Sequence, residues 1–575
     1  MKRYWKYIRP YIQYYILGPC FMMMEVVGDV LLPYMLAKII NQGIAERNVV
    51  YIIKIGAIMG LIAVIMAVGG VLGAWFASKA SMNFGADLRM DLFEKIQQFS
   101  FQNIDNFSTG SLITRLTNDI TQIQNMIMMT LRMCLRSPGI LIGAMVMAFV
   151  ISPKLAAIFI IVLPVLAVLI VVIMRRAFPQ FRTLQEKLDA LNSCIQEGLV
   201  GIRLIKSFVR GDYEEMRFEK RNQQLKEANL TAMKTMLLYT PLMTLALNIT
   251  TVVVVWSGGN MIVVGNMQVG DLTAFTNYIV QIMSSLTMLS IAFLNWARAI
   301  ASFRRVGEVL DEKIDLTDEN AKHKDRAVCE GSVEFQNVSF RYYKNSPEWV
   351  IENISFKLEA GKTLGIIGST GSGKSTLVSM IPRLYDTDEG TVLVDGINVR
   401  DYGLKPLREG IGMVLQNNTL FSGSITENLK WGDEHADEKA VRKVAQNAQA
   451  AGFIDSFKDG YRTRLEQSGN NVSGGQKQRL CIARALLKCP KILILDDSTS
   501  AVDTATERAI REALHSEYKD MTKIIIAQRI RSVMDADEIL VLDNGKTAGF
   551  GTHEQLLADC PVYREIYDVQ NGREE

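Results

Sequence analysis

The residues of this sequence best suited to metal and water chemistry are Asp496 and Asp497, which end the apolar run of ILILDDSTSAVD, Ile492–Asp503. A hydrophobic strand that ends in carboxylates can present them to a metal ion and to a reactive water. Upstream, GSTGSGKST (Gly368–Thr376) fits the phosphate-loop pattern G-x-x-x-x-G-K-[ST]. An Asp at the end of such a strand is the usual second half of a phosphate-loop site, so we predict that Asp496 is the metal-side acid.

The phosphate loop has the required context, because it follows the apolar run TLGIIG and opens into LVSMIPRL. Glycines let main-chain N–H groups point at phosphate oxygens, Lys374 reaches the β- and γ-phosphates, and Ser375 supplies a Mg²⁺ ligand. The helix N-terminus also attracts anions. We therefore predict ATP and Mg²⁺ as ligands, rather than a Gly-rich turn without a role. The predicted ATP contacts are Gly368, Ser369, Thr370, Gly371, Ser372, Gly373, Lys374, Ser375 and Thr376.

A second candidate anion site lies in VSGGQKQRLCIARALL, Val472–Leu487. Ser473, Gly474 and Gly475 stand where a predicted helix begins, and a helix N-terminus attracts phosphate groups. The pattern SGGQ is short and could belong to any loop. Its place just before the metal-side strand favours a functional role.

Two composition regimes divide the chain. From GSVEFQNVSFRY onward, short apolar runs alternate with helical stretches, which predicts an α/β phosphate-loop ATPase domain with a largely parallel sheet. The segment before it is long, apolar and helical, and predicts an all-α membrane domain. We expect a transmembrane domain at 1–310, a polar linker at 311–329 and a nucleotide-binding domain at 330–575.

Six apolar segments are long enough to span a bilayer, which takes roughly 20 residues. They lie near 15–40, 52–78, 131–151, 154–176, 236–262 and 271–297. The N-terminal tail and the segment after the fourth span are basic, whereas VGNMQVG, between the fifth and sixth, has no charge. The positive-inside rule therefore predicts that both termini and the ATPase domain are cytoplasmic.

The basic N-terminus MKRYWKYIRP could suggest a signal peptide. The apolar stretch after it is longer than a signal-peptide core and contains Glu25 and Asp29, so we expect a retained first membrane helix. Acids within a membrane segment are costly and often functional, but a structural role in a helix contact or beside an aqueous cavity is the interpretation we favour.

Charge and cysteine usage exclude several classes of protein. The net charge of +3 is too small to suggest a nucleic-acid partner. The 7 cysteines show no CxxC spacing, which argues against a disulfide framework or a zinc site.

With these motifs together, the chain resembles an ATP-binding cassette exporter half, one membrane domain fused to one ATPase domain. The membrane half contributes FSTGSLITRLTNDITQIQ (Phe107–Gln124) and QEGLVGIRLIKSF (Gln196–Phe208) to the resemblance. The resemblance implies that Tyr342 stacks on adenine. It also implies that Ser375 and Gln416 bind Mg²⁺ and that Asp496 binds it directly or through water. It also implies a signature motif facing the partner's ATP (Val472, Ser473, Gly474, Gly475, Gln476) and a loop across the dimer seam (Ser500, Ala501, Val502, Asp503).

In this family two cassettes pair head to tail, and each ATP is held by the phosphate loop of one and the signature of the other. The resemblance further implies short coupling helices at the ends of the cytoplasmic hairpins, near Phe101–Phe107 and Phe208–Tyr213.

The chain departs from the family pattern at Asp497, where most members have the Glu that polarises the attacking water. The intrinsic pKa values of Asp and Glu, ~3.9 and ~4.3, barely differ. Reach differs by one methylene, and a misplacement on the order of 1 Å can cost ~10²-fold in rate. We therefore predict that Asp497 is a poor general base.

A second departure is Gln528 of IIIAQRI, where the family has the switch-loop His. A glutamine can donate a hydrogen bond to a γ-phosphate but cannot relay a proton. A third, weaker departure is Gln467, at a position where an acid is expected; Glu466 stands one position earlier.

Asp497 and Gln528 both belong to the ATP site on this chain's own phosphate loop, whereas the signature that serves the opposite site is intact. Two losses at one site favour a common cause. The chain therefore resembles the degenerate-site subunit of heterodimeric multidrug exporters, whose partner subunit carries Glu and His at these positions. Catalysis is then expected mainly where this chain's signature meets the partner's phosphate loop.

Two alternatives stay open: a homodimeric lipid or peptide exporter that tolerates the changes, and an ATP-gated membrane regulator or channel. For the substrate, the resemblance favours amphipathic small molecules before lipids and peptides. The 28 methionines suit an adaptable apolar cavity. We expect a multi-pass protein of the plasma membrane, and the cysteine usage suits a bacterial one.

Overall fold

The computed structural model describes residues 2–344, 346–498 and 502–571. The chain forms two compact units. The first comprises Met1–Gln97 and Gly110–Asp311, and the second comprises Gln98–Thr109 and Glu312–Glu575. The short stretch 98–109 thus belongs with the second unit, although the segments on both sides of it belong to the first.

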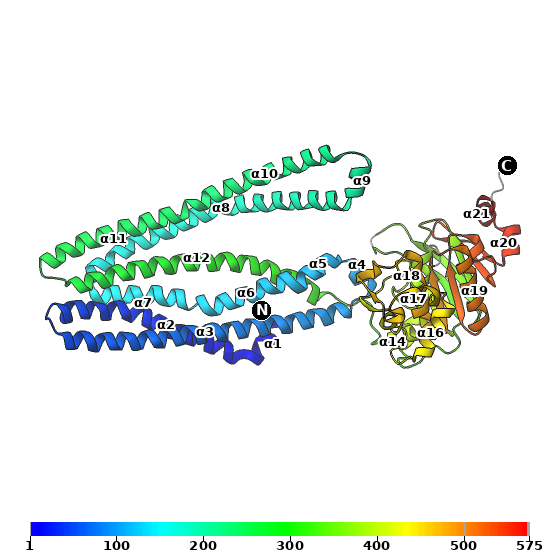
Figure 1. Ribbon diagram of the computed structural model, residues 1–575, viewed down its shortest axis with the longest axis horizontal. Helices are drawn as coiled ribbons and strands as arrows, with labels where there is room; N and C mark the ends of the chain where they lie inside the picture. The colour runs from blue at the N-terminus through cyan, green and yellow to red at the C-terminus, as the bar shows by residue number, and fades with distance from the viewer. Residues whose placement is uncertain (1, 345, 499–501, 572–575) are drawn as a thin grey trace. The chain divides into compact units, whose positions relative to one another are not determined.

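The first unit is built from helices, most of them long (Figure 1). They are α1 (Trp5–Ile8), α2 (Ile12–Lys38), α3 (Val49–Gln97), α6 (Ile120–Met133), α7 (Arg136–Ile151), α8 (Pro153–Val200), α9 (Ile202–Ser207), α10 (Gly211–Leu237), α11 (Tyr239–Val263) and α12 (Val269–Asp311). Helix α5 (Thr109–Thr114) begins at the boundary between the units. The predicted membrane all-α domain is confirmed.

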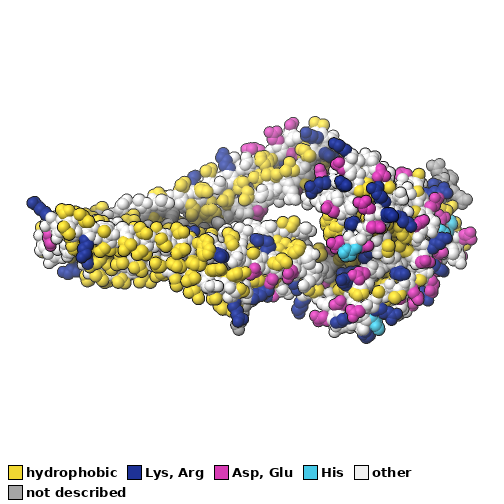
Figure 2. All heavy atoms as spheres, turned by 60° about the horizontal axis from the view of Figure 1, so that its bottom comes forward, with side chains coloured by type: hydrophobic (Ala, Val, Ile, Leu, Met, Phe, Trp, Pro, Cys, Tyr) yellow, Lys and Arg dark blue, Asp and Glu magenta, His cyan; other side chains and the backbone are white. Residues whose placement is uncertain are grey.

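Within the residues that the structure describes, five helical segments are long and apolar enough to cross a membrane: Trp5–Ile44, Val49–Gln97, Thr109–Ile151, Pro153–Val200 and Gly211–Val263. Figure 2 shows apolar side chains spread over the flank of the helical bundle. The sixth predicted span, 271–297, lies within α12 and is not among the five, so the count of six stays a prediction.

Helix α2 packs closely against both α3 and α7. A Cβ added at Gly69 would lie 3.0 Å from the carbonyl oxygen of Phe21, and one at Gly143 would lie 2.7 Å from Val30 Cγ2. Small residues of this kind let membrane helices approach each other. The acids of α2 pair with Arg136 of α7, whose Nη2 lies 2.7 Å from Glu25 Oε1 and 3.5 Å from Asp29 Oδ2. These acids therefore take part in a helix contact.

The second unit is an α/β domain, as predicted, with twelve strands among its described residues. The strands are β1 (Val333–Phe340), β2 (Ile351–Leu358), β3 (Thr363–Gly368), β4 (Glu389–Val394), β5 (Ile397–Asn398), β6 (Ile411–Val414), β7 (Gly423–Ser424), β8 (Arg464–Leu465), β9 (Ile492–Asp496), β10 (Thr522–Ile526), β11 (Glu538–Asp543) and β12 (Lys546–Gly551). Its helices are α4 (Phe101–Asp105), α13 (Lys374–Ser379), α14 (Leu404–Glu409), α15 (Ile425–Leu429), α16 (Glu438–Asn447), α17 (Ala451–Ser456), α18 (Gly474–Leu487), α19 (Thr504–Glu517), α20 (His553–Asp559) and α21 (Pro561–Asn571).

The main sheet of this unit has the order β12-β11-β3-β10-β9-β6, and all its pairings except that of β12 are parallel. Strand β9 is buried at every position, which explains its continuous apolar run. A second sheet, β2-β1-β4-β5, is antiparallel. The parallel sheet is the frame that positions the candidate site.

Candidate nucleotide site

Strand register brings the predicted site residues to one edge of the parallel sheet. Ile526 of β10 lies opposite Asp496 of β9 on one side and opposite Ile366 of β3 on the other. On the far side of β9, Val414 of β6 lies opposite Leu495. The carboxyl ends of these strands therefore meet, as is usual for ligand sites in parallel sheets. Gly368 ends β3, and the segments that follow β6, β9 and β10 contain Gln416, Asp497 and Gln528 respectively.

The phosphate loop runs from the end of β3 to the start of α13 at Lys374. Gly371 and Gly373 have φ angles of 86° and 89°, in the left-handed region that favours glycine. The Lys374 ammonium folds onto the loop and donates to the carbonyl oxygens of Gly368 at 2.9 Å and Ser369 at 2.7 Å. Burial lowers the pKa of Lys374. A half-buried ammonium at the start of a helix that follows a Gly-rich loop attracts phosphate.

Oxygen donors suited to Mg²⁺ lie beside this loop. The Ser375 hydroxyl donates to Asp496 Oδ1 at 3.0 Å, and Asp496 is only 3 % exposed. Burial raises the pKa of Asp496. Hydroxyl and carboxylate oxygens are the ligands that Mg²⁺ prefers, so the residues present fit the ion. Gln416 is exposed after β6 at the same sheet edge.

The side chains at the two departures are hydrogen-bonded to each other. Gln528 Nε2 donates to Asp497 Oδ2 at 2.9 Å. The main-chain N–H of Asp497 donates to the carbonyl of Ile526 at 3.1 Å, and its φ angle of 47° is left-handed, where Asp is tolerated better than most residues. Burial raises the pKa of Asp497. The base position and the switch-loop position thus form one linked pair.

Tyr342 lies next to the phosphate-loop helix. Its hydroxyl is 2.9 Å from Thr376 Oγ1, and its ring packs edge-on against Phe340 and Tyr385 at centroid distances of 5.1 and 5.3 Å. The side chain remains 36 % exposed. This placement is compatible with stacking on a base, which stays a prediction.

The signature segment begins helix α18. Ser473 caps it, accepting from the N–H of Gln476 at 3.3 Å, while Gln476 Oε1 accepts from the N–H of Ser473 at 2.9 Å. Ser473 and Gly474 are exposed, and Val472 packs against a hydrophobic core. The N-terminus of α18 is therefore open to an outside ligand.

The predicted seam loop is described in part. Ser500 and Ala501 lie outside the described residues, and Val502 is buried. Asp503 caps helix α19, accepting from the N–H of Thr506 at 2.9 Å.

The first coupling segment contains α4, within the predicted stretch Phe101–Phe107. Tyr385, which the sequence did not single out, donates to Asp105 Oδ2 at 2.8 Å, and its ring lies 5.9 Å from that of Phe101. In the second, the short helix is α9, just before the predicted stretch Phe208–Tyr213. Val209, with a φ angle of 52°, interrupts the helix before α10 begins.

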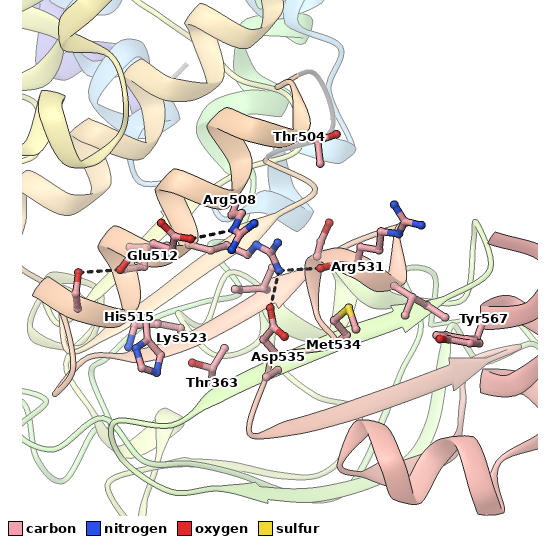
Figure 3. A pocket seen from close by; sticks show the side chains of 17 residues that line it. Thr363, Thr504, Arg508, Glu512, His515, Lys523, Arg531, Met534, Asp535 and Tyr567 are labelled. Carbon is pink, nitrogen blue, oxygen red and sulfur yellow. Dashed lines mark hydrogen bonds and ion pairs between the residues drawn. The ribbon is translucent and has the colours of Figure 1, made fainter. Parts of the chain in front are cut away.

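A cavity of about 740 Å³ lies elsewhere on the ATPase unit, beside α19 (Figure 3). Its charged walls pair internally: Arg508 Nε lies 2.9 Å from Glu512 Oε1, and Arg511 Nη1 lies 3.3 Å from Asp535 Oδ2. Its lining includes no phosphate-loop residue. The nucleotide site is therefore assigned to the sheet edge and not to this cavity.

Comparison with known proteins gives two family matches. Residues 15–286 match the model described as ABC transporter transmembrane region, and residues 351–500 match the model described as ABC transporter. The chain is 39% identical over 574 residues to YfiB of Bacillus subtilis, an uncharacterised ABC transporter ATP-binding protein, covering 100% of this chain and 99% of that one. It is 33% identical over 584 residues to YgaD of the same organism, provisionally named a multidrug export ATP-binding/permease protein, with 99% of each chain covered.

Among solved structures, the chain resembles a bacterial Atm1-family ABC exporter with ATP bound. The TM-score is 0.81 at 24% sequence identity, and the match covers 99% of both chains. At this identity the likeness concerns the fold.

Proposed function

The chain belongs to the ABC transporter family as the fused membrane and ATPase half of an exporter, and on that premise we propose that it exports amphipathic small molecules as one subunit of a heterodimer. The ABC ATPase region implies ATP hydrolysis coupled to transport. In this proposal residues 1–310 form the transmembrane domain, 311–329 the linker and 330–575 the cassette. ATP with Mg²⁺ binds at the phosphate loop and at Ser375, Gln416 and Asp496.

The observation that carries the proposal is the hydrogen bond of 2.9 Å between Gln528 Nε2 and Asp497 Oδ2. A Gln carboxamide can donate a hydrogen bond but cannot take up or relay a proton, and an Asp carboxylate is one methylene shorter than the Glu of related exporters. The two side chains are hydrogen-bonded to each other at the place where the attacking water would be activated. We infer a site that holds ATP and hydrolyses it slowly.

The intact signature supports catalysis at the other composite site. Ser473 and Gly474 are exposed at the capped N-terminus of α18, which suits contact with a nucleotide held by the partner subunit. A partner subunit with Glu and His at its catalytic positions would complete that site. One weak and one competent site can coexist in a heterodimer, whereas a homodimer would have two weak ones.

The substrate class follows the relative YgaD, whose provisional name refers to multidrug export. The apolar helices of the first unit suit a bilayer and amphipathic cargo. By the positive-inside rule, both termini and the cassette lie on the cytoplasmic side of the plasma membrane.

The test compares the chain purified alone with the chain co-purified with the half-transporter encoded beside it, both reconstituted in liposomes. We expect ATPase activity and transport of a fluorescent amphipathic dye by the pair and at most a small fraction of either by the single chain. Equal rates would refute the heterodimer and favour the homodimeric exporter. Dye flux that persists with a non-hydrolysable ATP analogue would favour the ATP-gated channel instead.

A further inference from the structure

The C-terminal helix α21 contacts the switch loop through the side chain of Gln570. Gln570 Nε2 donates to the main-chain oxygen of Gln528 at 2.8 Å, and Gln570 Oε1 accepts from the N–H of Ile530 at 2.8 Å. One carboxamide therefore forms hydrogen bonds with the Gln528 carbonyl and the Ile530 N–H, on either side of Arg529, as an adjacent strand would. Fixing these two groups fixes the direction in which the Gln528 side chain leaves the backbone.

Helix α21 is a rigid support for this contact. Tyr563 is 0% exposed and its hydroxyl lies 2.7 Å from His553 Nδ1. Ile566 and Tyr567 pack against a core that includes Ala527 and Ile530 on either side of Gln528. Because the helix is anchored, Gln570 loses little further freedom when it holds the loop.

A second element holds the next residue of the same segment. Arg511 of α19 donates from Nη1 to the main-chain oxygen of Arg531 at 2.7 Å and pairs with Asp535 (Figure 3). The segment that follows β10 is thus held by α21 on one side and by α19 on the other. At the start of this segment, the Gln528 side chain donates to Asp497.

We propose that Gln570 is a positioning residue that sets how tightly this chain's own site holds ATP. It acts through Gln528: the Gln570 carboxamide fixes the switch-loop backbone, and the fixed backbone places the Gln528 carboxamide beside Asp497 and the phosphate loop. The proposal rests on the proposed function in one respect, since it takes this site to be one that retains ATP.

The test measures binding of a fluorescent ATP analogue with Mg²⁺ to the full-length chain, with Lys374→Ala defining the background. Gln570→Met keeps the side-chain length and helix propensity but removes both hydrogen bonds. We expect binding to weaken about three- to tenfold, the range for losing one or two exposed neutral hydrogen bonds. The matched control is Val569→Met, a neighbour that is 77% exposed, which should bind as the wild type does.

Two further measurements separate positioning from a general structural effect. Hydrogen exchange of residues 526–534 should accelerate in Gln570→Met, whereas Gln570→Glu, which keeps the acceptor, should retain protection at Ile530. In a Gln528→Ala background, Gln570→Met should cause no further loss of binding, because it acts through that side chain.

Unchanged binding and exchange in Gln570→Met, or an additive loss in the double variant, would overturn the positioning role. These outcomes concern ATP binding to one chain. A homodimeric transport result would instead refute the heterodimer and leave the positioning role standing.

Discussion

At the scale of single residues, Ser473 and Asp497 are predicted to serve different ATP sites. Under the proposed function, Ser473→Ala removes a hydroxyl directed at the nucleotide of the partner subunit, whereas Asp497→Ala removes a base that is already poor. In the co-purified pair we expect Ser473→Ala to lower ATPase turnover by about 10²-fold, the range for losing a preorganised donor, and Asp497→Ala to lower it less than about threefold. Steady-state ATPase assays in liposomes would measure both.

The control for this comparison must account for helix capping, because Ser473 also caps α18. Thr552 makes the same capping box with Gln555 at the start of α20. Thr552→Ala should lose a comparable amount of stability, about 1 kcal/mol, without the loss of turnover. Equal losses of turnover from Ser473→Ala and Asp497→Ala would contradict the asymmetry.

Asp496 is expected to destabilise the cassette when no cation is bound. Burial raises its pKa above the ordinary value, so the ionised form costs free energy in the folded state at neutral pH. Without ATP and Mg²⁺, Asp496→Asn should raise the thermal unfolding midpoint at pH 7.5 by a few degrees. The gain should shrink as the pH falls through the raised pKa toward ~3.9, because the wild-type carboxyl is then protonated in both states.

The same variant should lose most of the stabilisation that MgATP gives the wild type, since ligand binding to the folded state raises its stability. Thermal unfolding with and without MgATP measures both effects. An unchanged midpoint together with an undiminished MgATP shift would rule out the metal-side role.

Site residues that belong to a local sequence motif could be predicted from the sequence. Residues that contact the site from distant positions in the chain could not. The phosphate loop is contiguous, and Asp496 follows a recognisable apolar strand. Gln570 and Tyr385 reach their partners across 42 and 280 positions and belong to no spacing motif. Only the folded chain brings them to the switch loop and to Asp105.

At the scale of elements, the contact between α4 and Tyr385 connects the 98–109 segment to the cassette core. Tyr385→Phe keeps the ring contacts with Phe101 but removes the hydrogen bond to Asp105. We expect ATP binding to be unchanged and dye transported per ATP hydrolysed to fall about tenfold or more, as for loss of a hydrogen bond to a charged group, which is worth ~1.5–3 kcal/mol. Parallel transport and ATPase measurements give this ratio.

The matched variant is Asp105→Asn, whose side-chain oxygen can still accept from the Tyr385 hydroxyl and should leave the ratio near that of the wild type. Burial raises the pKa of Tyr385, so the hydroxyl stays protonated and the ratio should not vary between pH 6 and 9. A loss in Asp105→Asn together with a normal ratio in Tyr385→Phe would point to the charge of Asp105 rather than to the hydrogen bond.

Helices and strands lie where the sequence predicts them when the apolar pattern is strong. Their bounds differ from the prediction where the backbone conformation of a single residue ends the element. The buried strand β9 and the helix after the phosphate loop lie where the apolar runs predict them. The second short helix ends earlier than predicted, because Val209 takes a left-handed conformation that no periodicity reveals.

At the scale of the whole molecule, the composite-site hypothesis predicts that this chain's own site can be repaired. The double variant Asp497→Glu and Gln528→His restores the longer carboxylate and a group that can take up a proton. Placed in a Ser473→Ala background, it reports only on the repaired site, because the opposite site has lost its signature hydroxyl. We expect the ATPase rate of the pair to rise about tenfold above that of Ser473→Ala alone.

The expected gain is smaller than the ~10²-fold often attributed to a well-placed base, for a reason visible at Asp497. Its φ angle of 47° suits Asp better than Glu, so the longer side chain is held under backbone strain. The strain should appear as a small loss of thermal stability that Gln528→His alone does not cause. If the triple variant is no faster than Ser473→Ala, the slow step at this site lies outside the Asp497–Gln528 pair. The asymmetry between the two ATP sites would then need another origin.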